Sequence, residues 1–152
     1  MSTTIKTIST EQTIPLRSMV LRPGLPESTC HLEGDQADTT QHFGLFKDEK
    51  ILAIVSRMQS SYLTPNDWQI RAMAVHPDHR REGLGREILQ FVLEQGKEAR
   101  TEIIWCNARE VAVPFYRSLG FQKVGDVFTV PGIGPHYKMV FASSDTFHLY
   151  EI

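Results

Sequence analysis

The stretch from residue 68 to 100 constrains the fold most, because an apolar run, a glycine-bearing turn and an amphipathic segment follow one another there without interruption. The run WQIRAMAV (68–75) has the length of a strand and ends at the turn signal HPD (76–78). Apolar residues then recur at helical spacing from Ile88 to Leu93, with polar residues between them. The stretch therefore predicts a strand, a tight loop and a helix in succession.

Two glycines, Gly83 and Gly85, stand where this helix is expected to begin. They leave backbone N–H groups unshielded, and the helix dipole favours negative charge at that end. Arg80, Arg81 and Arg86 add positive charge, so we interpret the segment as a phosphate-binding loop. Its spacing lacks the Gly-Lys-Ser/Thr of a Walker motif and the third glycine of a dinucleotide fingerprint, which disfavours nucleotide hydrolysis and NAD binding.

Length and charge set the class of protein. A chain of 152 residues predicts one domain over 1–152. Its 16 basic and 18 acidic residues give a net charge of -2, and the lack of a basic block beyond residues 80–81 argues against nucleic-acid binding. No apolar run reaches the ~18 residues that would span a bilayer, and the N-terminus lacks the apolar core of a signal peptide. We expect a soluble cytoplasmic protein without a membrane partner.

Cysteine and histidine patterns give no indication of a metal. Cys30 and Cys106 are far apart and form no Cys-x-x-Cys pair, so neither a metal site nor a disulfide framework is indicated. His76 and His79 flank the central turn, but two histidines without a third ligand make a weak site. We expect no metal cofactor.

The other elements are predicted from short apolar runs and turn residues. A helix is expected to start near Thr13, which would place Pro15 in its first turn; the alternative is a helix capped by Ser9 or Thr10 and kinked at Pro15. The polar segment 27–40 is interpreted as a surface loop. A second helix is expected to start around Val111, with Pro114 in its first turn, and to stop at Gly120, a residue suited to a left-handed cap. The predicted strands cover 4–8, 42–46 and 51–58 (the last two as a β-hairpin), 102–106 (parallel to 68–75), 122–128 and 137–141. A loop is expected over 129–136, and there is no clear prediction for the tail 142–152.

Two motifs together resemble a known family. The loop RREGLG (80–85) matches Arg/Gln-x-x-Gly-x-Gly/Ala, and AVPFYRSLGF (112–121) supplies a short tyrosine-bearing helix and a Gly-Phe pair about thirty residues later. Both are features of the GNAT superfamily of acyl-CoA-dependent N-acetyltransferases. The segment PGIGPHY (131–137), with EGD (33–35) and HFG (42–44) upstream, is similar to its ElaA-like branch. The resemblance implies an α/β (α+β) fold, with a mixed central sheet of about six to seven strands and helices on both faces.

The resemblance also implies a site for acetyl-CoA. The pyrophosphate would meet backbone N–H groups of the glycine loop, and the pantetheine arm would run beside residues 73–75 as an added strand would. A tyrosine at position 116 would protonate the departing thiolate, unless it is only a core residue; Asn107 would bind the cofactor, unless it caps a helix. The implied cofactor-binding residues are Met73, Ala74, Val75, Arg80, Arg81, Glu82, Gly83, Leu84, Gly85, Arg86, Asn107 and Tyr116.

The general base is not indicated by the central strand. Many relatives carry a glutamate there, but residues 68–75 include no carboxylate. A base would have to come from loops, and the candidates are Glu33, Asp35, His42, Asp67 and His136. We select His136 with Tyr116 as the catalytic residues, because histidine titrates near neutral pH and His136 follows two glycines and two prolines. The alternative is a surface histidine that opens the last strand.

These residues predict direct transfer of an acetyl group to a primary amine of a small acceptor. Cys106 stands at a predicted strand end, which leaves an acyl-cysteine route open. A bulkier acyl group shares all the motifs, and a CoA-binding sensor without catalysis would keep the loop but would not need Tyr116. The slightly acidic chain favours a small cationic amine. Dimers are common in the family, so a homodimer also stays open.

Overall fold

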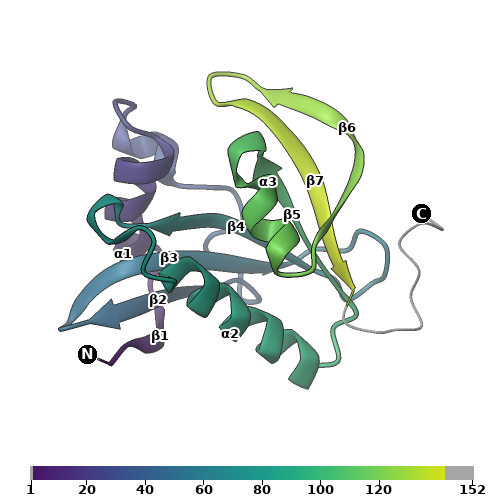
Figure 1. Ribbon diagram of the computed structural model, residues 1–152, viewed down its shortest axis with the longest axis horizontal. Coiled ribbons are helices and arrows are strands. Elements are labelled where there is room, and N and C mark those ends of the chain that lie inside the picture. The colour runs from purple at the N-terminus through teal and green to yellow at the C-terminus, as the bar shows by residue number, and fades with distance from the viewer. Residues whose placement is uncertain (1, 143–152) are drawn as a thin grey trace. The chain divides into compact units, whose positions relative to one another are not determined.

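The computed structural model describes residues 2–142, and Figure 1 shows the arrangement of the chain. Seven strands occur in the order β1-β2-β3-β4-β5-β7-β6, which confirms the expected mixed sheet. The tail from residue 143, for which the sequence made no prediction, lies outside the described residues. The described residues form two compact units: one holds residues up to 58 with 71–92, and the other holds 59–70 with 93–142.

The first unit contains an antiparallel run of strands and the end of the central strand. Its strands are β1 (Thr4–Ile8), β2 (Gln41–Lys47) and β3 (Lys50–Gln59), followed by the second half of β4 (Trp68–Val75). The turn between β2 and β3 consists of Asp48 and Glu49, both with positive φ, as in the tightest hairpins. The core of this unit includes the buried side chains of Ile8, Leu16, Ile54 and Ala74.

The first helix differs from the prediction. It covers α1 (Thr10–Leu16) and begins three residues earlier than expected, because Ser9 and Gln12 form a capping box. Pro15 therefore lies in the helix interior, where it supplies no N–H. The chain continues as a π-helix, η1 (Arg17–Leu21), which widens the next turn.

Segment 27–40 also departs from a plain surface loop. It begins with a 3-10 helix, η2 (Glu27–Cys30), and its Asp35 is buried at 6% exposure. This carboxylate lies inside the unit because side chains from two other elements bind it, as described below.

The second unit continues the sheet from the first half of β4. Trp68–Ile70 pair in parallel with Ile104–Cys106, which confirms the parallel strands expected on either side of the helix. The strands β5 (Ile103–Arg109), β7 (Gly134–Ala142) and β6 (Gln122–Val130) are then antiparallel neighbours. Helix α3 (Val113–Ser118), preceded by η4 (Glu110–Ala112), contacts β5, β6 and β7 (Figure 1).

Gly120 ends α3 in the left-handed conformation expected of it, with φ +101. Its N–H donates to the carbonyl oxygen of Arg117, and the N–H of Phe121 donates to the carbonyl oxygen of Tyr116. Pro114 occupies the first turn, as predicted. The predicted loop 129–136 is shorter than expected, since Val130 already pairs with Gly134 across the β6–β7 turn.

Candidate functional site

The glycine loop precedes helix α2 (Leu84–Glu98) and contains two residues with positive φ. Arg81 has φ +65 and Gly83 has φ +79, whereas Arg80 between η3 (Pro77–His79) and the loop has φ -68. The carbonyl of Gly83 accepts the first helical hydrogen bond, from Glu87 N at 3.0 Å. Gly83 is therefore the N-cap, and the first turn of a helix leaves N–H groups without partners inside the helix. These N–H groups and the helix dipole favour an anion at this end of the helix.

The charges around the loop leave two arginines for a ligand. Glu82 is paired within the unit: its carboxylate lies 3.5 Å from Lys47 Nζ and 3.1 Å from His79 Nδ1. Arg80 and Arg81 are exposed, and neither forms an ion pair in the part of the chain that the structure describes. The loop therefore carries unmatched positive charge beside its backbone N–H groups.

The end of β4 departs from regular strand geometry just before the predicted pantetheine segment. Ala72 has φ +55, a left-handed conformation that interrupts the extended chain. Ala74 is buried in the core, while Met73 and Val75 are partly exposed. His76 N donates to Leu52 O at 2.8 Å and so continues the pairing with β3. Residues 73–75 and 80–86 belong to the same compact unit.

Tyr116 lies in α3 and is 6% exposed. Its ring meets Phe115 and Phe121 edge to face, at centroid distances of 5.2 and 5.4 Å. Burial raises the pKa of the phenol well above its ordinary value, and Cys106 adds to the increase. Its hydroxyl makes no hydrogen bond within residues 2–142, although a buried tyrosine usually has one. Tyr116 is thus a core side chain that also keeps its proton at neutral pH.

Cys106 lies beside this tyrosine in the second unit and is 2% exposed. Burial strongly raises the pKa of the thiol. Because the thiolate is the nucleophilic form of cysteine, this environment disfavours the acyl-cysteine route.

Asn107 does not lie past the end of a strand, as predicted, but within β5, opposite Lys138 of β7. The strand continues to Arg109 because pairing with β7 extends that far. The alternative role of Asn107 as a helix cap is therefore wrong, since Arg109 precedes η4. The side chain of Asn107 is exposed.

His136 lies in β7 rather than in a loop and is 7% exposed, which excludes the surface alternative. Its ring stacks on Phe128 at 5.8 Å, and Nδ1 lies 2.9 Å from Gly134 O. A carbonyl oxygen only accepts, so Nδ1 carries the hydrogen and Nε2 of the neutral ring has a lone pair. His136 is held in the tautomer that a general base requires.

Asp67 is not available as a base. It is fully buried, and its Oδ2 accepts hydrogen bonds from the backbone N–H groups of Tyr62, Leu63 and Thr64 at 2.6–3.0 Å. Its Oδ1 accepts the Thr64 hydroxyl. The residue shapes the β3–β4 loop.

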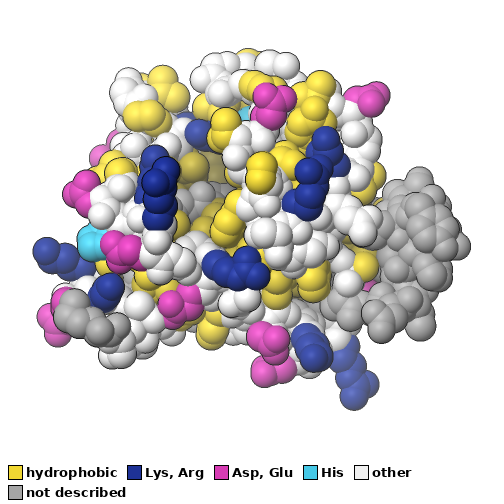
Figure 2. Space-filling model, in the orientation of Figure 1, with side chains coloured by type: hydrophobic (Ala, Val, Ile, Leu, Met, Phe, Trp, Pro, Cys, Tyr) yellow, Lys and Arg dark blue, Asp and Glu magenta, His cyan; other side chains and the backbone are white. Residues whose placement is uncertain are grey.

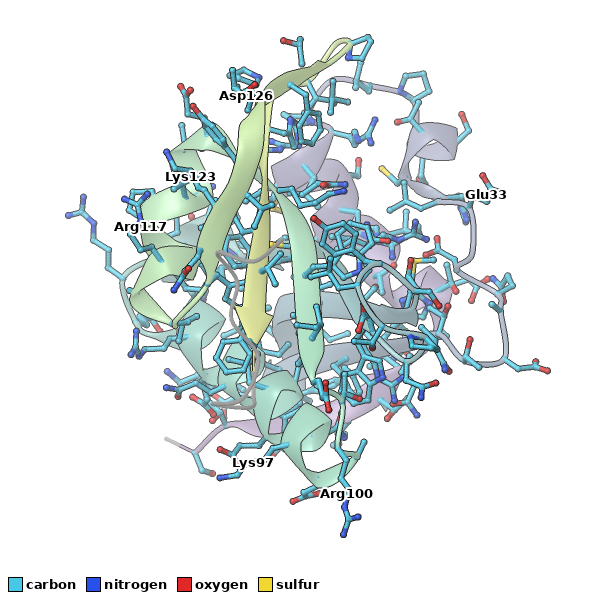
Figure 3. The ribbon with its side chains drawn as sticks, turned by 90° about the vertical axis from the view of Figure 1, so that its right-hand side faces the viewer. Glu33, Lys97, Arg100, Arg117, Lys123 and Asp126 are labelled. Atoms are coloured by element: carbon cyan, nitrogen blue, oxygen red, sulfur yellow. The ribbon has the colours of Figure 1, made fainter. Side chains whose placement is uncertain are left out.

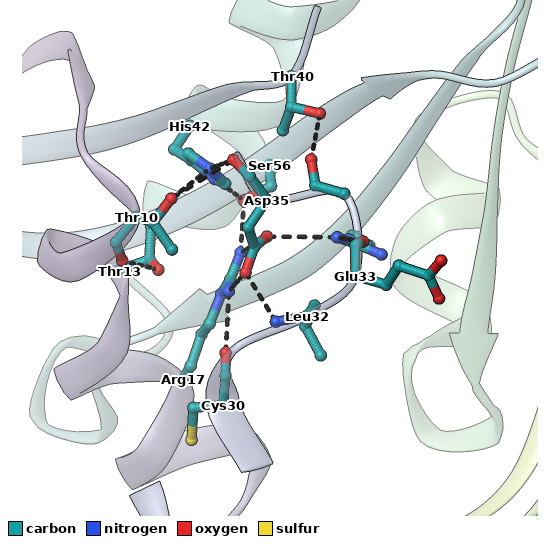
Figure 4. A network of polar contacts seen from close by, with 12 residues as sticks. Thr10, Thr13, Arg17, Cys30, Leu32, Glu33, Asp35, Thr40, His42 and Ser56 are labelled. Atoms are coloured by element: carbon teal, nitrogen blue, oxygen red, sulfur yellow. Dashed lines mark hydrogen bonds and ion pairs between the residues drawn. The ribbon is translucent and has the colours of Figure 1, made fainter. Parts of the chain in front are cut away.

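A buried polar network, shown in Figure 4, occupies two further candidates. Asp35 accepts both terminal nitrogens of Arg17, at 2.7 and 3.1 Å, and the Leu32 N–H at 2.7 Å. Burial alone would raise the pKa of Asp35, but these bonds and the charges of Arg17 and Arg71 lower it below its ordinary value. His42 Nδ1 lies 2.6 Å from Ser56 Oγ.

The other ring nitrogen of His42 lies 3.0 Å from the Asp35 carbonyl oxygen, so both nitrogens are engaged inside the unit. Of the five base candidates, Asp35, His42 and Asp67 are therefore held in hydrogen bonds within the protein. Glu33 is exposed, and Nε2 of His136 has no hydrogen-bond partner within residues 2–142. No local pattern in the sequence indicates this network, since its partners come from α1, η1, η2, β2, β3 and β4.

The first unit has a separate pocket of about 500 Å³ between α1, η1 and η2. It contains none of the predicted site residues. Its lining residues are Glu11, Ile14, Pro15, Ser18, Met19, Glu27 and His31.

Within residues 2–142, no group of three or more His, Cys, Asp or Glu side chains is placed to hold a metal ion. No helix in this range has the length and apolarity required to cross a bilayer. On the face shown in Figure 2, basic and acidic side chains are interspersed.

Comparison with known proteins identifies relatives across nearly the whole chain. Residues 28–142 match the family model described as "Acetyltransferase (GNAT) domain". The chain is 30% identical over 138 residues to the uncharacterised N-acetyltransferase YitI of Bacillus subtilis. This alignment covers 89% of this chain and 93% of the relative.

Solved structures give the same fold. ElaA of Escherichia coli superposes with a TM-score of 0.73 at 19% identity, over 92% of this chain and 99% of that one. An aminoglycoside 6'-N-acetyltransferase, solved in complex with coenzyme A, superposes with a TM-score of 0.74 at 12% identity, over 91% and 96%.

Proposed function

Because the chain belongs to the GNAT acetyltransferase family, we propose that it transfers an acetyl group from acetyl-CoA directly to a primary amine of a small acceptor. The observation that carries the proposal is the loop at residues 80–86: a helix N-terminus capped by Gly83, beside two exposed arginines that form no ion pair within residues 2–142. Acetyl-CoA supplies a thioester carbonyl that an amine lone pair can attack.

The glycine loop binds the pyrophosphate of acetyl-CoA in this proposal. The N–H groups of Arg81, Gly83, Gly85 and Arg86 donate to the phosphate oxygens, and the arginine charges balance them. Leu84 is 4% exposed and anchors the first turn of α2 from inside. Residues 73–75 bind the pantetheine arm through their backbone groups, and the left-handed Ala72 interrupts the regular strand geometry just before them.

Two residues of the second unit move protons in the proposed reaction. His136 accepts a proton from the acceptor ammonium at Nε2, because Nδ1 is committed to the Gly134 carbonyl. Tyr116 donates its phenolic proton to the leaving thiolate, and its raised pKa keeps that proton in place beforehand. Asn107, exposed on β5, contributes an amide to the cofactor. The high pKa of the Cys106 thiol supports direct transfer without a covalent intermediate.

A second candidate is a protein that binds acyl-CoA without catalysis. The absence of a carboxylate from β4 favours it, since β4 offers only Gln69 and Arg71 as polar side chains after Trp68. Such a sensor would need the loop but neither Tyr116 nor His136.

The deciding experiment is release of free thiol from acetyl-CoA by the purified protein in the presence of a pooled amine library. Amine-dependent release, reduced in Tyr116→Phe and His136→Gln, is the expected result. Binding of acetyl-CoA without release by any amine would favour the sensor, and lack of binding would overturn both candidates.

A further inference from the structure

Arg71 is a partly exposed member of the buried network and keeps hydrogen-bond donors for a ligand. Arg17 and Arg71 share the carboxylate of Asp35, but their situations differ. The side chain of Arg17 is 1% exposed, and its terminal nitrogens donate to Asp35, Ser56 and the Cys30 carbonyl. Arg17 is therefore enclosed and structural.

Arg71 is held more loosely and faces outward in part. Its side chain is 21% exposed, and only Nη2 has partners: Asp35 Oδ1 at 3.2 Å and the Glu33 carbonyl oxygen. Nη1 makes no hydrogen bond to any described residue, and Nε is buried without a partner. A guanidinium carries five N–H donors, and the two on Nη1 of Arg71 remain for another molecule.

The charge of Arg71 is also not balanced by the network. Asp35 forms a bidentate ion pair with Arg17 at 2.7 and 3.1 Å, and the charge of Arg17 alone balances its single negative charge. Figure 4 shows the Glu33 carboxylate pointing away from this network, and no ion pair joins it to Arg71 within residues 2–142. Asp35 therefore shares one negative charge between two guanidinium groups, and the group of Arg71 is fixed in direction by two contacts.

The position of Arg71 along β4 places this charge near the proposed acetyl donor. Arg71 precedes Met73 by two residues, about 7 Å along a strand, and all residues from Arg71 to Val92 belong to one compact unit. The irregular Ala72 lies between them. An anionic group held by Arg71 would therefore lie beside the segment that binds the pantetheine arm.

We propose that Arg71 binds a carboxylate of the acceptor, and that Asp35 is the positioning residue that orients its guanidinium. The inference rests on the proposed function and gives it a substrate class: an amine that also carries a carboxylate, as an α-amino acid does. It replaces the weaker expectation of a purely cationic amine that net charge suggested. Arginine is suited to this role because its planar fork matches a carboxylate.

The test compares matched pairs of acceptors, each an α-amino acid and the amine left by its decarboxylation, with thiol release as the readout. The wild-type protein is expected to favour the carboxylate-bearing member by about tenfold or more in kcat/KM, as one charged hydrogen bond allows. Arg71→Gln should abolish this preference through KM, Arg71→Lys should restore part of it, and Asp35→Asn should weaken it in the same direction. Arg100→Gln, an exposed arginine in the turn after α2 (Figure 3), is the control and should retain the preference.

Calorimetric binding of acetyl-CoA to every variant separates the possible failures. Variants that bind acetyl-CoA normally are folded, so a lost preference then reports on Arg71. Equal or faster transfer to the decarboxylated amines, or a preference that survives Arg71→Gln, would overturn the inference and leave the transferase intact. If no amine is acetylated, amino acids are titrated into the CoA complex: binding that Arg71→Gln abolishes would support the carboxylate site without the transferase, and no binding would overturn it.

Discussion

The glycine loop and the Asp35 network belong to the same compact unit but use polar groups in opposite ways. The loop exposes backbone N–H groups and the side chains of Arg80 and Arg81. The network buries Asp35 and Arg17, and supplies their hydrogen-bond partners from within the protein. A charged side chain beside N–H groups that lack acceptors indicates a ligand-binding role. A charged side chain whose hydrogen-bond partners lie within the protein indicates a structural role. Arg71 combines both features, because Nη2 is held by the network and Nη1 makes no hydrogen bond within residues 2–142.

The largest expected effect comes from removing the charge of Asp35 from the buried network. Asp35→Asn leaves the Arg17 guanidinium buried without its counter-charge, so we expect a loss of about 3–5 kcal/mol in the free energy of unfolding. Thermal or urea unfolding would measure it. Asp126→Asn, at an exposed site on β6 (Figure 3), is the control and should change stability by less than about 0.5 kcal/mol. A similar small loss for Asp35→Asn would contradict the role of the network.

The same carboxylate predicts a dependence of stability on pH. The pKa of Asp35 is lower in the folded protein than its ordinary value of 3.8. Its stabilising contribution is therefore fully present above that value and is lost as pH falls through the folded pKa. The stability difference between the wild type and Asp35→Asn should shrink on acidification between about pH 5 and pH 2, and a constant difference would exclude Asp35 as its source.

The second effect comes from blocking the exposed glycine loop. Gly83→Glu places a negative side chain in the loop, and we expect CoA affinity to fall about 1,000-fold, or roughly 4 kcal/mol. Gly125→Glu is a matched control, because both glycines have φ +79 and open space where a side chain would begin. Equal affinities of the two variants in calorimetry would remove the phosphate site from the loop.

A smaller effect distinguishes catalysis from binding. Tyr116→Phe keeps the ring contacts with Phe115 and Phe121 but removes the proton, so kcat should fall about 100-fold with CoA affinity unchanged. Tyr137→Phe, on β7, is the control and should keep full turnover. An unaltered kcat in Tyr116→Phe would assign Tyr116 to the core alone.

The smallest expected effect concerns Cys106. Because burial raises the pKa of its thiol, Cys106→Ala should keep turnover within about twofold of the wild type while losing some stability. A loss of turnover beyond tenfold, in a variant that still binds acetyl-CoA, would restore the acyl-cysteine route.

The parts of the fold that depend on local sequence were predictable. The central strand has the predicted bounds, Trp68–Val75, and the hairpin and Gly120 cap also match. These features arise from residues close together in the chain: apolar runs, turn residues and a glycine at a helix end.

The parts that failed depend on distant partners. Asp35 looked like a loop carboxylate because its arginines lie 18 and 36 residues away. His136 looked like a loop residue because pairing with Arg109 and Phe128, which extends β7, is not visible in its neighbours. Helix α1 starts at Thr10 rather than near Thr13 because Ser9 and Gln12 form a capping box, and this start places Pro15 in the helix interior.

The measurement that tests the central claim most directly is a calorimetric titration of the protein with CoA and, separately, with pantetheine, which lacks the pyrophosphate. If the loop at residues 80–86 binds the pyrophosphate, CoA should bind at least about 100-fold more tightly, and Gly83→Glu should remove that difference while Gly125→Glu keeps it. Equal affinities for CoA and pantetheine in the wild-type protein would contradict the account.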